Sequence, residues 1–178
     1  MKKTETKILR DPKYATSSEY PIRQNHPEIF AGHGFIKVLA RQEPDAPMLG
    51  HREFLPNKQR GRFIWQTREQ VLRRSESIGA FLRGRVGISR GMSVALVSAT
   101  REDWHVLFYG CSMIGAVMVP IWDGYDSDSI CRLFEISDSV AVFCSPEKLE
   151  IVNEAAMKVA LLPSPEGEGK PEEEEEEE

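Results

Sequence analysis

A chain of 178 residues is long enough for one domain of ordinary size, and its 40% apolar and 29% charged residues are typical of a globular protein. The formal net charge of −5 is unevenly distributed, because residues 163–178 hold nine glutamates and one lysine while the remainder is mildly positive. The arginines are scattered over several predicted elements without interleaved aromatic residues, which excludes an obvious nucleic-acid surface.

The sequence predicts an intracellular protein without a signal peptide or a transmembrane segment. The N-terminus mixes lysines with acidic residues, and no apolar region follows them. The longest apolar run, 111–121, contains Ser112 and Pro120 and is shorter than the roughly 20 residues of a spanning helix. The three cysteines lie far apart in apolar patterns, so they are predicted to be reduced core residues rather than metal ligands.

Residues 1–60 are predicted to be largely irregular. Prolines recur there too often for a long helix or a central strand, at positions 12, 21, 27, 44, 47 and 56. Only Phe35–Leu39 has the pattern of a strand. The segment also holds His26, His33 and His51, which lack metal-ligand spacing.

Residues 61–162 form the predicted folded domain, which opens with the short β-like run Phe63–Trp65. Thr67 and Gln70 then make a capping-box signal for a helix that begins near Arg68. Glycines at positions 84 and 87 end that helix. Its inward face is predicted to hold Val71, Ser75, Ile78 and Leu82.

Strand and helix patterns then alternate. Predicted strands are Ser93–Val97, Val117–Ile121 and Val140–Cys144. Between them come a helix capped by Thr100 and one around Asp128–Ile136, and a last helix opens with Ser145 and Pro146. The inward face of the first of these helices is predicted to hold Trp104, Leu107, Phe108, Cys111 and Ile114. Crossovers of this length require parallel strands, so the predicted fold class is α/β, a three-layer arrangement with a mostly parallel sheet.

Residues 163–178 are predicted to be a disordered acidic tail, because seven consecutive glutamates repel one another at helical spacing. Such a tail can bind a basic protein partner. The plainer interpretation is a solvated charge run, or coding sequence translated past an exon boundary, and it is favoured.

Motifs that would carry chemistry are weak. The turn after the strand Ser93–Val97 contains no glycine, which disfavours a dinucleotide fingerprint, and no P-loop or nucleophile elbow occurs. His105 and Asp103 are neighbours on a helix and point in different directions, so they are not expected to form a dyad.

Asp123, Asp126 and Asp128 follow a strand end and have carboxylates that can bind a metal. A turn at Asp123-Gly124 followed by helix-capping acids explains the same residues and is favoured. We therefore assign no catalytic, cofactor-binding or metal-binding residue.

Six segments carry a family resemblance through their order and spacing: Met48–Arg52, Trp65–Val71, Arg90–Leu96, Arg101–Trp104, Gly115–Asp123 and Glu135–Phe143. Together they resemble the N-terminal subdomain of the AMP-forming acyl-CoA synthetases, specifically the long-chain fatty acyl-CoA synthetases. The most specific segment is Gly115–Asp123, which is similar to the family pattern G-A-V-x-V-P-L-Y-D.

The resemblance implies a reaction in which a fatty acid and ATP form an acyl-adenylate and CoA then displaces AMP, with Mg²⁺ and cationic groups offsetting phosphate charge. The family's phosphate loop, adenine motif, Mg²⁺-associated glutamate and catalytic lysine have no counterpart here. The chain is therefore expected to be an N-terminal portion without independent activity or cofactors of its own. Two alternatives stay open: a non-catalytic interaction module with an acidic tail, and a flavodoxin-like nucleotide binder.

Overall fold

The computed structural model describes residues 29, 31–56 and 59–161. It divides into two compact units, each assembled from two stretches of sequence. The hairpin unit comprises Met1–Arg90 and Arg101–Ala116, and the sheet unit comprises Gly91–Thr100 and Val117–Glu178, as far as these ranges are described. The predicted boundaries of 1–60, 61–162 and 163–178 stay a prediction.

The sheet unit is built around a three-stranded parallel sheet in the order β4-β3-β5. Its elements are β3 (Ser93–Val97), β4 (Val117–Ile121), α5 (Ser127–Ser137), β5 (Ser139–Cys144) and α6 (Leu149–Ala160). All three predicted strands are therefore confirmed, as is the predicted α/β class with a parallel sheet. The strands begin and end in register, so their carboxyl ends lie at one edge of the sheet.

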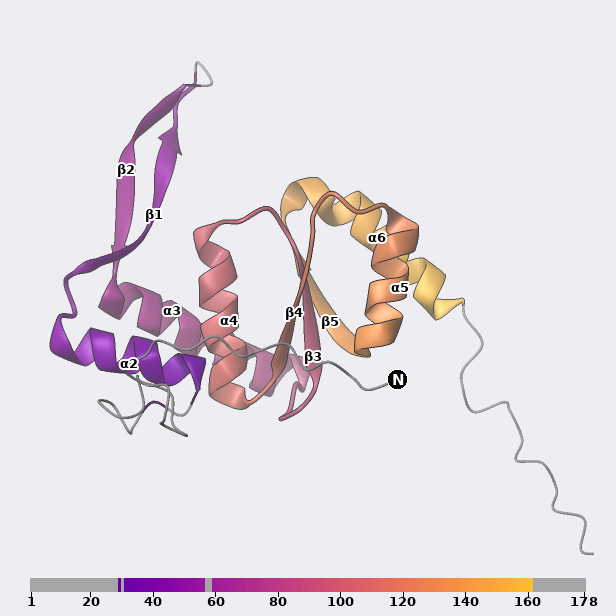
Figure 1. The fold of residues 1–178 in the computed structure, drawn as a ribbon, viewed down its shortest axis with the longest axis horizontal. Helices are drawn as coiled ribbons and strands as arrows, with labels where there is room; N and C mark the ends of the chain where they lie inside the picture. Colours follow the sequence, from indigo (N-terminus) through magenta and orange to yellow (C-terminus); the bar gives the residue numbers. More distant parts are fainter. Residues whose placement is uncertain (1–28, 30, 57–58, 162–178) are drawn as a thin grey trace, which may run out of the picture. The chain divides into compact units, whose positions relative to one another are not determined.

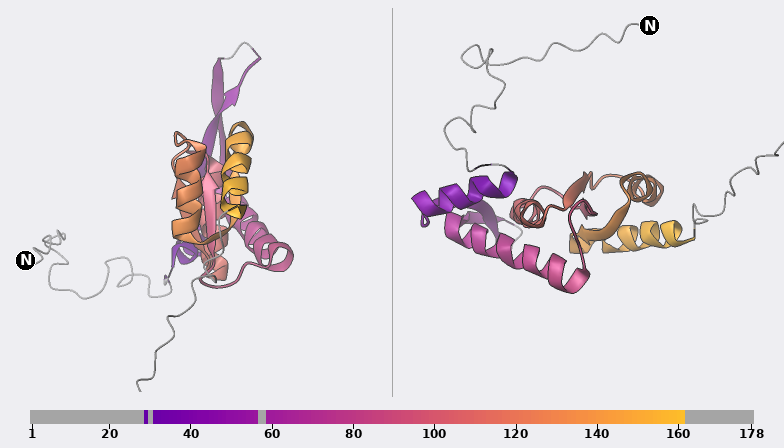
Figure 2. Two further views of the ribbon diagram at one scale, coloured as in Figure 1. Left: turned by 90° about the vertical axis from the view of Figure 1, so that its right-hand side faces the viewer. Right: turned by 90° about the horizontal axis from the view of Figure 1, so that it is seen from below.

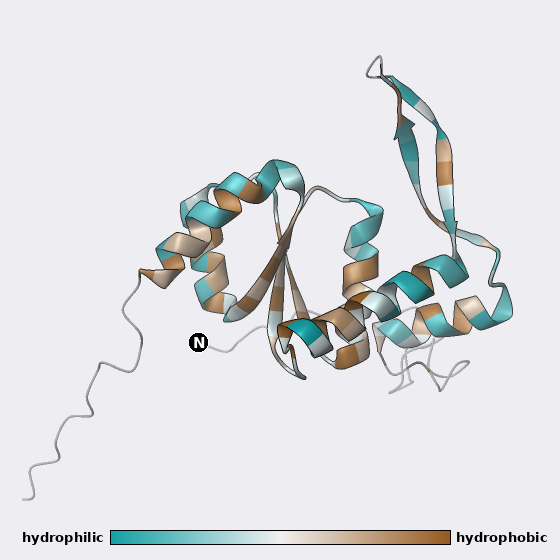
Figure 3. Cartoon of the chain, turned by 180° about the vertical axis from the view of Figure 1, so that it is seen from behind, coloured by the Kyte–Doolittle hydropathy of each residue, from teal (hydrophilic) through white to brown (hydrophobic). Residues whose placement is uncertain are grey.

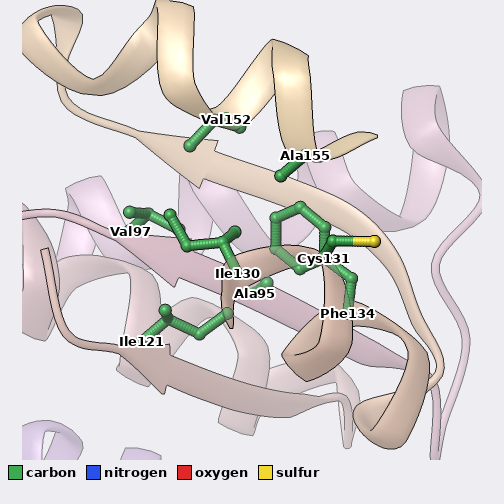
Figure 4. Packing of buried hydrophobic residues seen from close by; sticks show 8 residues of the cluster. All are labelled: Ala95, Val97, Ile121, Ile130, Cys131, Phe134, Val152 and Ala155. Atoms are coloured by element: carbon green, nitrogen blue, oxygen red, sulfur yellow. The ribbon is translucent and has the colours of Figure 1, made fainter. Parts of the chain in front are cut away.

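One continuous core holds the sheet unit together. Helices α5 and α6 lie side by side over one face of the strands (Figures 1 and 2). The buried side chains, shown in Figure 4, are Ala95, Val97, Ile121, Ile130, Cys131, Phe134, Val152 and Ala155. Burial of each large apolar side chain contributes about 1.5–3 kcal/mol, so this cluster accounts for the docking of both helices.

The helix starts in the sheet unit differ in detail from the predicted ones. Asp126 caps α5, since its Oδ1 accepts a hydrogen bond from the Ser129 N–H at 2.8 Å. Ser145 stands at the predicted position before Pro146, but its side chain makes no capping bond. A 3₁₀ turn, Pro146–Lys148, comes first, and α6 follows it.

The hairpin unit combines an antiparallel two-stranded ribbon with helices. Its elements are α2 (Gly32–Gln42), β1 (Pro47–Phe54), β2 (Arg60–Thr67), α3 (Arg68–Phe81), the π-helical turn η2 (Leu82–Val86) and α4 (Glu102–Ile114). Ile36, Val71, Val106 and Tyr109 form its core. In Figure 3 the strands of the parallel sheet are coloured as hydrophobic over most of their length, whereas hydrophilic and hydrophobic residues mix along the hairpin.

The prediction of a strand at Phe35–Leu39 is wrong, because these residues lie in helix α2. The buried positions of α2 are Gly34, Ile36, Val38 and Ala40, which alternate as in a strand. Positions two residues apart lie on opposite sides of a helix, and α2 has two neighbours, α3 and α4. Strand β1 was not predicted either, because Pro47 disfavours a central strand. Pro47 is the first residue of β1, a position at which proline is tolerated.

The capping box of α3 is confirmed. The Thr67 side chain accepts from the Gln70 N–H at 3.3 Å, and the Gln70 side chain accepts from the Thr67 N–H at 2.9 Å. After the turn η2, Gly87 adopts a left-handed conformation with φ of 81°, as expected of a glycine that ends a helix.

Helix α4 departs from its prediction at its start and on its inward face. Its N-cap is Arg101 rather than Thr100, and no side chain caps it. Val106 and Tyr109 are buried, whereas Phe108 is exposed. Within the part of the chain that the structure describes, no helix combines the length and the apolar character needed to cross a membrane.

Candidate functional site

The carboxyl edge of the parallel sheet is where ligands bind in open α/β folds, so it is the first place to look for a site. Val97, Ile121 and Cys144 stand opposite one another at this edge. The residues that follow them are Ser98, Trp122 and Ser145.

The two serines at this edge are both buried. The Ser98 hydroxyl donates to the carbonyl oxygen of Ala99 at 3.0 Å. The Ser145 backbone N–H donates to the carbonyl oxygen of Val97 at 3.3 Å, which ties the end of β5 to the end of β3. Ser145 is only 4% exposed, and its hydroxyl has no hydrogen-bond partner among the described residues.

The three aspartates near this edge do not converge on a metal site. Asp123 lies in the turn closed by the Tyr125 N–H and the Trp122 carbonyl at 3.3 Å. Asp126 caps α5, and Asp128 pairs with Lys158. Over residues 29, 31–56 and 59–161, no group of three or more His, Cys, Asp or Glu side chains is arranged to hold a metal ion. The turn-and-cap interpretation of the aspartates is confirmed.

A polar clamp joins the start of α5 to α6. The Ser127 hydroxyl donates to Glu154 Oε1 at 2.8 Å, and Lys158 Nζ lies 2.9 Å from the same carboxylate and 2.5 Å from Asp128 Oδ1. Its hydrogen bonds to Asp128 and Glu154 raise the pKa of Lys158 above its ordinary value. Glu154 and Lys158 stand four residues apart, but the contacts with α5 had no signal in the sequence.

A second polar cluster lies in the hairpin unit, and it was not predicted from the sequence. His51 Nδ1 of β1 lies 2.8 Å from Glu102 Oε2 of α4. Arg74 of α3 reaches Asp103 at 2.5 Å, and Arg101 lies 3.0 Å from the same carboxylate. Asp103 is thus engaged by two arginines, which agrees with the prediction that it forms no dyad with His105. The pairs are largely exposed, so each is expected to add little stability.

The remaining candidates for chemistry are in structural positions. The His33 ring lies 3.1 Å from Ser112 Oγ, and burial, followed by the charge of Lys37, lowers the pKa of His33. His26 lies outside the described residues. All three cysteines are free, and burial raises the pKa of the Cys111 thiol to about 11, which disfavours the nucleophilic thiolate.

These residues do not fit the phosphates of a nucleotide or a Mg²⁺ ion. The turn after β3 has no glycine to admit a phosphate close to the backbone, and two of the aspartates already have partners. We therefore assign no step of a reaction to the side chains at this edge.

The parallel sheet and the helices packed on it define an α/β protein. The polar side chains near the carboxyl edge of its sheet make structural contacts. A family profile described as AMP-binding enzyme matches residues 37–178. The chain belongs to the AMP-binding enzyme family.

Two curated relatives point to acyl-CoA ligases. The peroxisomal long chain acyl-CoA synthetase 7 of Arabidopsis thaliana is 26% identical over 128 residues, which cover 72% of this chain and 18% of that protein. The long-chain-fatty-acid–CoA ligase FadD15 of Mycobacterium bovis is 29% identical over 62 residues, which cover 35% of this chain and 10% of that protein. The chain thus spans less than a fifth of the length of these relatives.

Solved structures support the fold. The N-terminal domain of FACL13 from Mycobacterium tuberculosis gives a TM-score of 0.58 at 21% identity, with 74% of this chain and 30% of that chain covered. The A-PCP didomain of carboxylic acid reductase from Segniliparus rugosus gives 0.64 at 20% identity, with 72% and 19% covered. The predicted resemblance to the N-terminal portion of acyl-CoA ligases is confirmed.

Proposed function

We propose that this chain is the structural N-terminal part of a long-chain fatty acid–CoA ligase. The complete enzyme would convert a fatty acid, ATP and CoA into acyl-CoA, AMP and diphosphate, with Mg²⁺ accompanying ATP. The observation that carries this proposal is the family match over residues 37–178, and the likeness to a long-chain acyl-CoA synthetase supports the substrate class.

We further propose that the 178-residue chain forms no acyl-adenylate by itself. This proposal is supported by the structural contacts that its aspartates already make. Asp126 caps a helix, Asp128 pairs with Lys158, and Asp103 is paired with two arginines. The role of this part of the fold would be to supply a rigid βα framework against which nucleotide-binding segments pack.

The experiment is an assay for acyl-adenylate by mass spectrometry, with purified chain, a long-chain fatty acid, ATP and Mg²⁺. A complete long-chain acyl-CoA synthetase serves as the positive control. We expect the signal of this chain to equal that of the control without protein. Acyl-adenylate above that level would overturn the proposal of inactivity while leaving the family membership intact.

A protein partner for the acidic residues 163–178 remains a proposal that rests on their charge alone. Affinity capture with the full chain and with a variant truncated after Leu162 tests it. Recovery of the same proteins by both would remove the tail as a binding segment.

A further inference from the structure

We draw no further inference here: the strongest candidate, the exposed aromatic patch of the β1–β2 ribbon where Phe63 stacks on Trp65 and Arg52 lies over Phe63, carries nothing because the chain spans less than a fifth of the length of its curated relatives and nothing in the described residues shows what covers this patch.

Discussion

The two units of this chain are held together in different ways. In the sheet unit, successive strands and helices pack side chains from each element into one apolar cluster. In the hairpin unit, α3 and α4 approach so closely that glycines are required, and much of the remaining contact is polar and exposed. The comparison teaches that the sheet unit depends on large side chains that fill its core, whereas the hairpin unit depends in addition on the absence of side chains at the glycines where α3 and α4 meet.

The largest expected effect is in the sheet unit. Ile130→Ala removes a fully buried side chain from the centre of the cluster and should lower the free energy of unfolding by about 2–5 kcal/mol. Ile136→Ala on the same helix is the control, because Ile136 is 72% exposed, and should change it by less than about 0.5 kcal/mol. Urea denaturation measures both values. Similar costs for the two would contradict the assignment of the core.

The next effect tests the close approach of α3 and α4 in the hairpin unit. A Cβ atom at Gly110 would lie 2.8 Å from Ile78 and 3.1 Å from the Ser75 carbonyl oxygen, so Gly110→Val should cost about 1–3 kcal/mol. Gly84→Val is the control, since nothing lies within 4 Å of a Cβ there. Hydrogen exchange should show the loosening in α3 and α4. Equal tolerance of both valines would refute the close approach of these helices.

A smaller effect compares two helix caps that look alike in the sequence. Thr67→Ala removes a formed capping box in the hairpin unit and should cost about 1 kcal/mol. Ser145→Ala in the sheet unit removes a buried hydroxyl that bonds to nothing described, so it should be neutral or stabilising. Thermal unfolding of the two variants checks the difference. A loss at Ser145 as large as that at Thr67 would show a partner for its hydroxyl.

The smallest effect is the titration of Asp126. Hydrogen bonds from Ser129, through its side chain and its backbone N–H, lower the pKa of Asp126 below its ordinary value. The ionised cap therefore stabilises the folded state at neutral pH, and this contribution is lost as the pH falls through the lowered pKa.

An NMR titration should show that Ser129→Ala raises the pKa of Asp126. Ser137→Ala is the matched control, because the Ser137 hydroxyl bonds to the Leu133 carbonyl within the same helix, and it should leave that pKa unchanged. An unchanged pKa in Ser129→Ala would mean that the backbone N–H alone holds the carboxylate.

The sheet unit could be predicted from the sequence because its signals are local. The buried strand β3 is a short aliphatic run, and the capping acid Asp126 stands directly before its helix. The hairpin unit was predicted less well, since the pairing of β1 with β2 and the burial of α2 against two helices depend on segments far apart in the chain.

At the candidate site, too, the sequence predicted contacts between nearby residues but not those between distant ones. The sequence was sufficient to interpret Asp123 and Asp126 as turn and cap residues, because those contacts span only a few positions. It contained no signal for the bond from Ser127 to Glu154 or for the pair of His51 with Glu102, whose partners are 27 and 51 residues apart.

By itself, the sequence determined the parallel strands, the start of α3 and the likeness to acyl-CoA ligases, because aliphatic periodicity, capping residues and ordered segments are properties of consecutive positions. Only the tertiary structure decided that α2 is a helix and that the Ser145 hydroxyl has no hydrogen-bond partner among the described residues. These features depend on which distant surfaces meet, and packing then overrides the preference of each local segment.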